Sequence, residues 1–330
     1  MTNQELIREA IDNGPQPLYK LFDNERVATI LSKAMLENTP FHDEPSNKSL
    51  RVRCRNTHKG DDLADIFGLD QHIFKPKYHD AISGDGQEAR RIRTIHSSSL
   101  ISLLCFYWVS ESRPLSLALD GRDVTFTKSA FEVKNPVGAD ETGNVHFSNI
   151  DVALLGKDST TGKPIVLFLE SKFSEYLNWG RYSGISNYVY AETYKQLIKR
   201  GDLDRMELKF EESSKNHSYS DLLSIKGRTN HYAAGIKQMV SHFLGVKTAL
   251  DAGLYKNADV YLGEILYEFP ESIDTEHKKI KDYTKLYDVL AQGLNTLSEP
   301  KFKIVQHCFT YQGVFKNNKL DAKVKDFYSL

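Results

Sequence analysis

The sequence predicts an α/β protein in which a mixed central sheet is flanked by helices, with a helical extension at the N-terminus. Strand-like apolar runs cluster between residues 115 and 173 and recur at 260–269 and 302–309. Patterns of helical period fall before, between and after these runs, an order that favours a mixed sheet. With 330 residues and 40% hydrophobic content, the chain can bury a large core.

The predicted extension covers residues 1–83. Apolar residues at helical spacing predict helices over 4–12 and 24–37, and a polar loop is expected at 38–48. Arg51, Arg53 and Arg55 alternate with Val52 and Cys54, so a strand here would carry three arginines on one face. That face is either a solvated edge or a stripe that contacts phosphates. Residues 60–84 are expected to be irregular apart from a short helix near 63–67.

The predicted main domain covers residues 84–330. It opens with a long helix over roughly 87–110, whose second half is apolar on nearly all sides and should be buried. The run 96–99, His-Ser-Ser-Ser, falls in the middle of this helix. The remaining expected elements are strands at 115–119, 124–133, 145–155, 165–173, 206–210, 260–269 and 302–309, and helices at 184–199, 231–252 and 276–297. The stretch 174–230 is long for a connection and is predicted to be an insertion or lid.

Composition narrows the classes of function. The net charge is −1, which disfavours strong non-specific binding to nucleic acid unless basic residues gather on one face. Three widely spaced cysteines without a CxxC pair argue against a disulfide framework or a four-ligand zinc site. The N-terminus has no apolar leader, and the longest apolar stretch, 100–109, is far shorter than the ~20 residues of a membrane span. A cytoplasmic protein is therefore expected.

One pair of segments carries the functional prediction. Asp151 opens an apolar run, a turn-rich segment follows at 156–164, and a second apolar run ends in Glu170-Ser171-Lys172. This order predicts a β-hairpin with an acid on one strand and an acid and a lysine, two residues apart and on one face, at the end of the other. Two carboxylates can hold a hard divalent cation, and the lysine can act on a water or on developing charge. A simple ion pair between Glu170 and Lys172 at the sheet edge is the alternative reading.

The chain contains three other Glu-x-Lys triplets, at 132–134, 207–209 and 276–278. None of them follows an acid-bearing strand across a turn, so the Asp151 hairpin is preferred.

This arrangement resembles the core signature of the PD-(D/E)XK nuclease superfamily, which has the restriction-endonuclease-like fold. The resemblance covers about residues 84–270, although Asn149-Ile150 stands where that signature usually has a proline. It implies Mg²⁺-dependent cleavage of phosphodiester bonds, with Asp151 and Glu170 as metal ligands and Lys172 as the catalytic lysine. It also makes Glu88, on the first helix, a candidate third carboxylate, and Gln238 a candidate residue near the site. A charge placed favourably in the first helical turn and a solvated glutamine are the respective alternatives.

Basic residues supply candidate contacts to nucleic acid, or else solvated faces. The candidates are Arg51, Arg53, Arg55, Arg91, Arg228 and Lys237.

The sequence therefore predicts an endonuclease that hydrolyses DNA with Mg²⁺ or Mn²⁺ and allows for a homodimer. Two alternatives remain: a nuclease-like module that binds without cleaving, and a metal-dependent hydrolase of another phosphoester.

Overall fold

The computed structural model describes residues 41–43, 52–54, 63–64, 67–83, 92, 97–139, 143, 145–173, 176, 184–185, 206–213, 218–225, 236–269, 271, 274 and 277–330. Only the backbone is described for 41–43, 52–54, 184–185, 206–213, 218–225 and 236–237. The predicted helices over 4–12 and 24–37 lie outside these residues, as does most of the predicted helix over 184–199.

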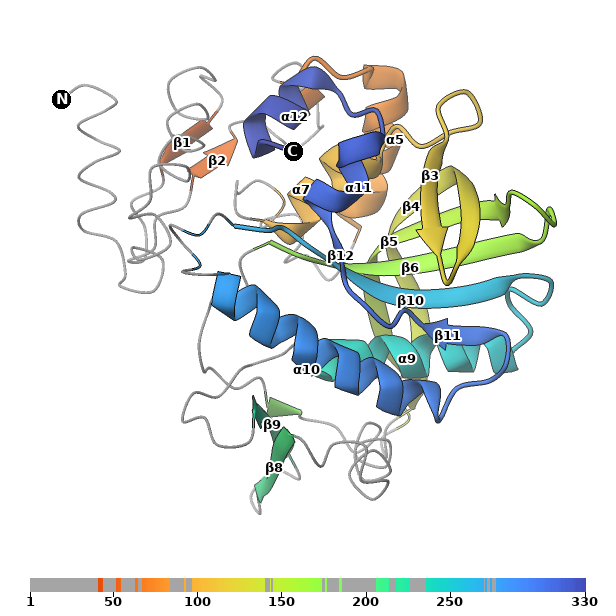
Figure 1. Cartoon of the computed structure of the whole chain (residues 1–330), viewed down its shortest axis with the longest axis vertical. Coiled ribbons are helices and arrows are strands. Elements are labelled where there is room, and N and C mark those ends of the chain that lie inside the picture. Colours follow the sequence, from red (N-terminus) through yellow and green to blue (C-terminus); the bar gives the residue numbers. More distant parts are fainter. Residues whose placement is uncertain are drawn as a thin grey trace.

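A seven-stranded mixed sheet organises the described residues, in the order β11-β10-β6-β5-β4-β3, with β12 also paired to β10 (Figure 1). Strands β3 to β6 pair antiparallel, whereas β10 is parallel to β6, β11 and β12. The strands are β3 (Leu115–Leu119), β4 (Arg122–Ala139), β5 (Val145–Asp158), β6 (Pro164–Lys172), β10 (Asp259–Leu266), β11 (Phe302–Ile304) and β12 (Phe309–Thr310). The predicted α/β class with a mixed sheet is confirmed.

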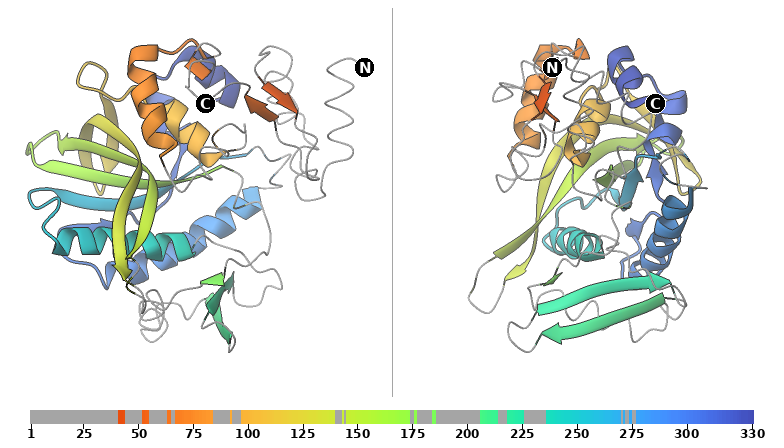
Figure 2. Two further views of the ribbon diagram at one scale, coloured as in Figure 1. Left: turned by 180° about the vertical axis from the view of Figure 1, so that it is seen from behind. Right: turned by 90° about the vertical axis from the view of Figure 1, so that its left-hand side faces the viewer.

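Helices cover both faces of this sheet (Figures 1 and 2). On one face lie α9 (Ile236–Asp251), which packs on β4 and β5, and α10 (Lys278–Asn295). On the other lie α5 (Gln71–Ala81), α7 (Ser98–Phe106), α11 (Tyr311–Asn317) and α12 (Ala322–Tyr328). No described helix is both long enough and apolar enough to cross a membrane.

Two smaller sheets complete the described strands. Strand β1 (Phe41–Asp43) pairs antiparallel with β2 (Val52–Cys54), so the middle of the alternating segment 51–55 forms a strand. Strands β7 (Gly184–Ile185), β9 (Ser218–Ile225) and β8 (Met206–Ser213) form the other. The prediction of a loop at 38–48 is wrong at β1, and the prediction of a helix from 184 is wrong at β7. Strands of two or three residues are too short to show a period in the sequence.

Helix α5 falls in a segment that was expected to be irregular. Asp70 caps its first turn by accepting a hydrogen bond from the N–H of His72, and Pro76 lies inside it. The proline obscured the helical pattern, since proline normally ends a helix. Phe74 and Tyr78 are fully buried, and the ring of Phe74 meets that of Tyr107 edge-on, with 5.4 Å between the ring centroids. This helix, assigned by prediction to the extension, therefore packs into the same core as the sheet.

The serines expected in the middle of the first main-domain helix instead begin it. Ser97 has extended backbone angles, and its hydroxyl accepts the N–H of Leu100 at 3.2 Å, which makes it the N-cap of α7. Serine favours this position because its side chain competes with the backbone inside helices but satisfies a free N–H at their start. The apolar second half of the predicted helix is buried, as expected.

The strand expected over 302–309 is interrupted. Its two ends form β11 and β12, while Gln306 and His307 turn outward to contact Asp288 on α10.

Candidate functional site

The predicted hairpin is formed by β5 and β6, which pair antiparallel from Lys157–Pro164 to Val152–Leu169. Asp151 and Glu170 are the next residues beyond the Val152–Leu169 pair, so they come from adjacent positions on the two strands. Asp158 shapes the connecting turn by accepting the N–H groups of Thr160 and Thr161, each at 2.9 Å. Strand β6 is buried from Ile165 to Lys172, as the continuous apolar run predicted.

Glu170 lies at the centre of a buried polar cluster. Its Oε1 accepts from Lys172 Nζ at 2.6 Å and from Gln238 Nε2 at 2.8 Å. Its Oε2 lies 2.9 Å from His242 Nε2. Glu170, Lys172 and His242 are only 3–4% exposed. Burial alone would raise the pKa of Glu170, but Lys172 and His242 outweigh burial and lower that pKa to about 2.

Asp151 has the opposite electrostatic character. Its Oδ2 accepts the backbone N–H of Ser171 at 2.8 Å. Burial, followed by the charges of Glu170 and Glu132, raises the pKa of Asp151 well above its ordinary value, and Lys172 offsets only part of this effect. The cluster therefore gathers more negative charge than its lysine neutralises.

Several neighbours of the site were not predicted. His242 follows Gln238 by four residues on α9, so both project from one side of that helix, and helical spacing in the sequence could have revealed the pair. Ser148 lies behind the histidine, with its Oγ 2.8 Å from His242 Nδ1.

Two further acids lie in the same row of the sheet. Glu132 stands opposite Asp151, because the residues on either side of it in β4 pair with the residues on either side of Asp151 in β5. The backbone of Glu132 is left-handed, with a φ of 48°. Glu264 pairs in register with Glu170 and is fully buried, with its Oε2 accepting from Tyr283 at 2.6 Å. Burial, and then Glu264, raise the pKa of Tyr283 well above its ordinary value. Only the pairing of the strands shows that these acids line up with Asp151 and Glu170.

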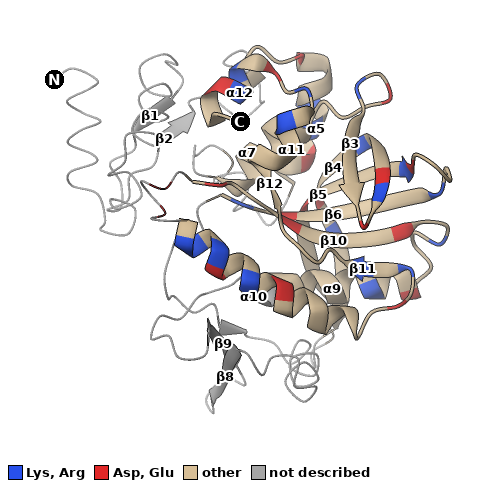
Figure 3. Cartoon of the chain, in the orientation of Figure 1, with Lys and Arg blue, Asp and Glu red and all other residues tan. Residues whose placement is uncertain are grey.

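The structure brings four of the predicted site residues together: Asp151, Glu170, Lys172 and Gln238. Glu88, Arg51, Arg55, Arg91 and Arg228 lie outside the described residues, and for Arg53 and Lys237 only the backbone is described. In Figure 3, the Lys residues of α10 are interspersed with Asp. Among the described residues, no three His, Cys, Asp or Glu side chains form a group that could by itself hold a metal ion.

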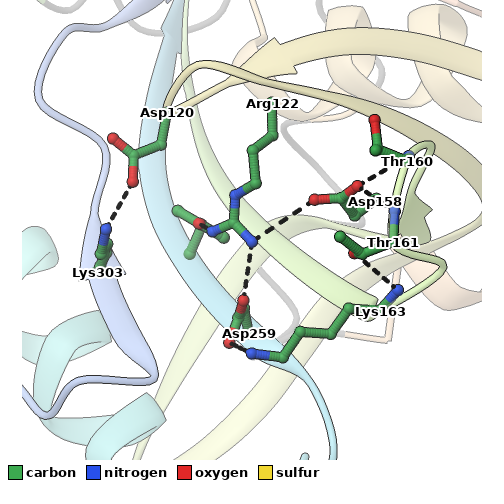
Figure 4. Close-up of polar contacts among 9 residues, drawn as sticks. Asp120, Arg122, Asp158, Thr160, Thr161, Lys163, Asp259 and Lys303 are labelled. Carbon is green, nitrogen blue, oxygen red and sulfur yellow. Dashed lines mark hydrogen bonds and ion pairs between the residues drawn. The ribbon is translucent and has the colours of Figure 1, made fainter.

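A second charged cluster lies at the opposite end of the sheet, where β6 and β10 begin (Figure 4). Arg122 contacts Asp259 at 2.9 Å and Asp158 at 3.8 Å, Lys163 contacts Asp259 at 2.6 Å, and Lys303 contacts Asp120 at 2.6 Å. Three cations thus meet three acids, so this cluster is balanced in charge, unlike the cluster around Glu170. A cavity of about 850 Å³ lies beside it, but the Asp120 and Lys303 charges on its lining already pair with each other.

These observations define an α/β protein with a buried acid–lysine site at the end of its central hairpin. Comparison with models of protein families, with curated proteins and with solved structures finds no match to the chain.

Proposed function

We propose that this protein is a metal-dependent endonuclease with a restriction-endonuclease-like core, and that it hydrolyses DNA phosphodiester bonds with Mg²⁺ or Mn²⁺. The observation that carries the proposal is the direct contact of Glu170 with Lys172 at the end of a buried strand, with Asp151 across the hairpin. Placing three ionisable groups this close together, with Glu170 and Lys172 buried and Asp151 partly buried, is unfavourable unless each is paired or serves a function.

The chemistry of the donor set suits a hard divalent cation. Glu170 and Asp151 offer carboxylate oxygens. Burial, and then the charges of Glu170 and Glu132, raise the pKa of Asp151, and a cation would offset the part that is due to these charges. Mg²⁺ commonly takes one or two protein carboxylates and completes its shell with water and substrate phosphate oxygens, so it needs no larger group of protein ligands. Asp151 and Glu170 would hold the ion, which when bound polarises the phosphoryl group and acidifies a water.

Lys172 and Gln238 have distinct roles in this proposal. Lys172 is held by Glu170 and by Gln238 Oε1, at 2.6 and 2.7 Å, so its ammonium is oriented before a substrate arrives. From there it would donate to the attacking water or to the phosphate and offset the charge that develops in the transition state. Gln238 is exposed, which puts its amide at the solvent side of the cluster.

One observation favours a second candidate function, a nuclease-like module that binds without cleaving. Both oxygens of Glu170 already take part in hydrogen bonds within the protein, so an ion must displace a donor before it can bind. If those donors stay in place, the cluster is only structural.

Cleavage assays with a panel of substrates test the proposal. We expect Mg²⁺- or Mn²⁺-dependent nicking or cleavage of plasmid, single-stranded or branched DNA, abolished by a chelator. Asp151→Asn, Glu170→Gln and Lys172→Met should each lower the rate by about 10²–10³-fold, because the first two weaken the binding of the cation and the third removes the positive charge that offsets the transition state. Lys163→Met is the matched control, since it removes a lysine from a lysine–carboxylate pair at the other end of β6 and should leave the rate unchanged.

Two results would contradict the proposal. If nucleotides are hydrolysed but no nucleic acid is cleaved, the protein acts on another phosphoester. If DNA is bound but not cleaved with either metal, and the three variants bind it as the unaltered protein does, the second candidate is correct.

A further inference from the structure

The two oxygens of the buried Glu170 carboxylate differ in what lies beyond their partners. Its Oε2 faces His242, and behind that ring lies Ser148, which is 2% exposed. Its Oε1 faces Lys172 and the exposed Gln238. An ion arriving from solvent would therefore meet the Oε1 side first, while the contact with His242 stays covered.

Helix α9 reaches the sheet closely enough for this contact because residue 245 is glycine. A Cβ added there would lie 3.1 Å from Ser148 Oγ and 3.1 Å from Asn135 Cβ, closer than side-chain atoms normally pack. Gly245 follows His242 by three residues and so lies on the same side of the helix. The close approach of α9 to β4 and β5 brings the imidazole between Ser148 and Glu170.

Hydrogen bonding fixes the state of the imidazole. An ionised carboxylate only accepts hydrogen bonds, so Nε2, 2.9 Å from Glu170 Oε2, must carry a hydrogen. The Ser148 hydroxyl both donates and accepts, so it can complete the hydrogen bonding at Nδ1. The chain Ser148–His242–Glu170 is thus satisfied at every atom with Nε2 protonated.

We infer that His242 is the positioning residue of Glu170: its Nε2–H fixes Oε2, so that Oε1 is the oxygen that can exchange a contact with Lys172 or Gln238 for a divalent cation. This inference rests on the proposed function, in which Glu170 is a metal ligand. It acts through Glu170 and not on substrate, because the ring is buried and both its nitrogens are occupied. Groups that orient a metal ligand typically change metal affinity or activity by about 10–100-fold when they are removed.

Two variants of His242 and a matched control test the inference. His242→Gln keeps an N–H group that can reach Glu170 and should retain Mn²⁺ affinity within a few-fold. His242→Leu keeps comparable bulk but removes the donor, and should weaken Mn²⁺ binding, measured by titration, by about 10–100-fold. His307→Gln is the control, because His307 also contacts an aspartate but its side chain is 80% exposed. This variant should leave Mn²⁺ affinity unchanged.

Nitrogen NMR of the imidazole gives a readout that does not depend on activity. The unaltered protein should show His242 protonated at Nε2, and Glu170→Gln should alter that resonance. A neutral ring protonated only at Nδ1 would overturn the inference, as would equal Mn²⁺ affinity in His242→Leu and the unaltered protein.

If the protein binds Mn²⁺ through Glu170 but cleaves no nucleic acid, the nuclease proposal fails while the role of His242 stands. If the unaltered protein cleaves DNA and His242→Leu cleaves it equally well, the nuclease proposal stands while the role of His242 fails.

Discussion

Asp151 and Glu170 are neighbours across one hairpin, yet the protein treats their charges in opposite ways. Glu170 is surrounded by donors and remains ionised, with its pKa lowered to about 2. Burial, followed by the charges of Glu170 and Glu132, raises the pKa of Asp151, although its carboxylate accepts the backbone N–H of Ser171. Such a divergence between adjacent carboxyl groups is typical of functional sites, although structural ion pairs also produce it.

Replacing Asp151 with asparagine should therefore stabilise the protein. Asparagine keeps an oxygen that can accept the N–H of Ser171 but removes the charge that Glu170 and Glu132 disfavour. We expect Asp151→Asn to raise the free energy of unfolding at pH 7 by about 1 kcal/mol, measured by urea denaturation, while cleavage is lost.

The pH dependence of this gain has a definite sign. A carboxyl whose pKa is raised on folding contributes stability at low pH, and that stability is lost as the pH rises above the unfolded value of ~3.9. The advantage of Asp151→Asn should therefore vanish near pH 3 to 4 and grow above it. Mg²⁺ should stabilise the unaltered protein and not the variant. A variant less stable than the unaltered protein at pH 7 would show that the Asp151 charge is compensated in the folded state.

At the scale of elements, amide side chains cover both outer strands of the main sheet. Asn295, at the end of α10, accepts the N–H of Ile304 in β11 at 2.7 Å and donates to its carbonyl at 2.8 Å. Asn318 does the same to Ser116 in β3, at 3.2 and 3.0 Å. Each amide takes the place of a neighbouring strand, which blocks the exposed edge from pairing with another chain.

Removing either amide should expose an edge. We expect Asn295→Ala and Asn318→Ala each to lower the free energy of unfolding by about 1 kcal/mol and to cause concentration-dependent self-association, measured by sedimentation. Gln312→Ala is the matched control, because Gln312 makes the same two bonds to Glu268, which lies beyond the end of β10 and not on an outer strand. Equal association of all three variants would show that loss of stability, and not an open edge, is responsible.

At the scale of the whole molecule, the two ends of the sheet differ in charge and in role. The end around Arg122 and Asp259 is balanced and ties the beginning of β4 to that of β10 (Figure 4). The end around Glu170 has excess negative charge and is closed by α9. Helix α5 joins the same core from the N-terminal side, through Phe74, Tyr78 and the Lys77 bond to the Ser129 carbonyl.

The core position of α5 leads to a prediction about truncation. A chain that starts at residue 84 loses Phe74 and Tyr78, and losing a single large buried aromatic side chain already costs about 3–5 kcal/mol. Against a total stability of about 5–15 kcal/mol, we expect this chain not to unfold cooperatively in thermal scans followed by circular dichroism. A chain that starts at Leu63 keeps α5 and should unfold cooperatively. Cooperative unfolding of the shorter chain at the temperature of the longer one would show that α5 is dispensable.

The local patterns in the sequence were enough to predict the strands between 115 and 172 and the α9 and α10 helices. Strand alternation, turn residues and apolar runs are patterns that extend over only a few residues. The hairpin that joins Asp151 to Glu170 and Lys172 could therefore be predicted directly from the sequence. Helix α5 was missed because Pro76 masks its period, and α11 and α12, of seven residues each, are too short to show one.

The sequence by itself therefore determined the class of fold and the acid–lysine hairpin, because short-range period and turn chemistry encode both. Only the tertiary structure decided what surrounds that hairpin. His242 lies 72 positions from Glu170, and its contact depends on how closely Gly245 lets α9 approach the sheet. Glu132 and Glu264 join the row of acids through strand register, and Asn295 and Asn318 reach the strand edges from helix ends. These contacts link separate elements, so their geometry is fixed only when the core packs.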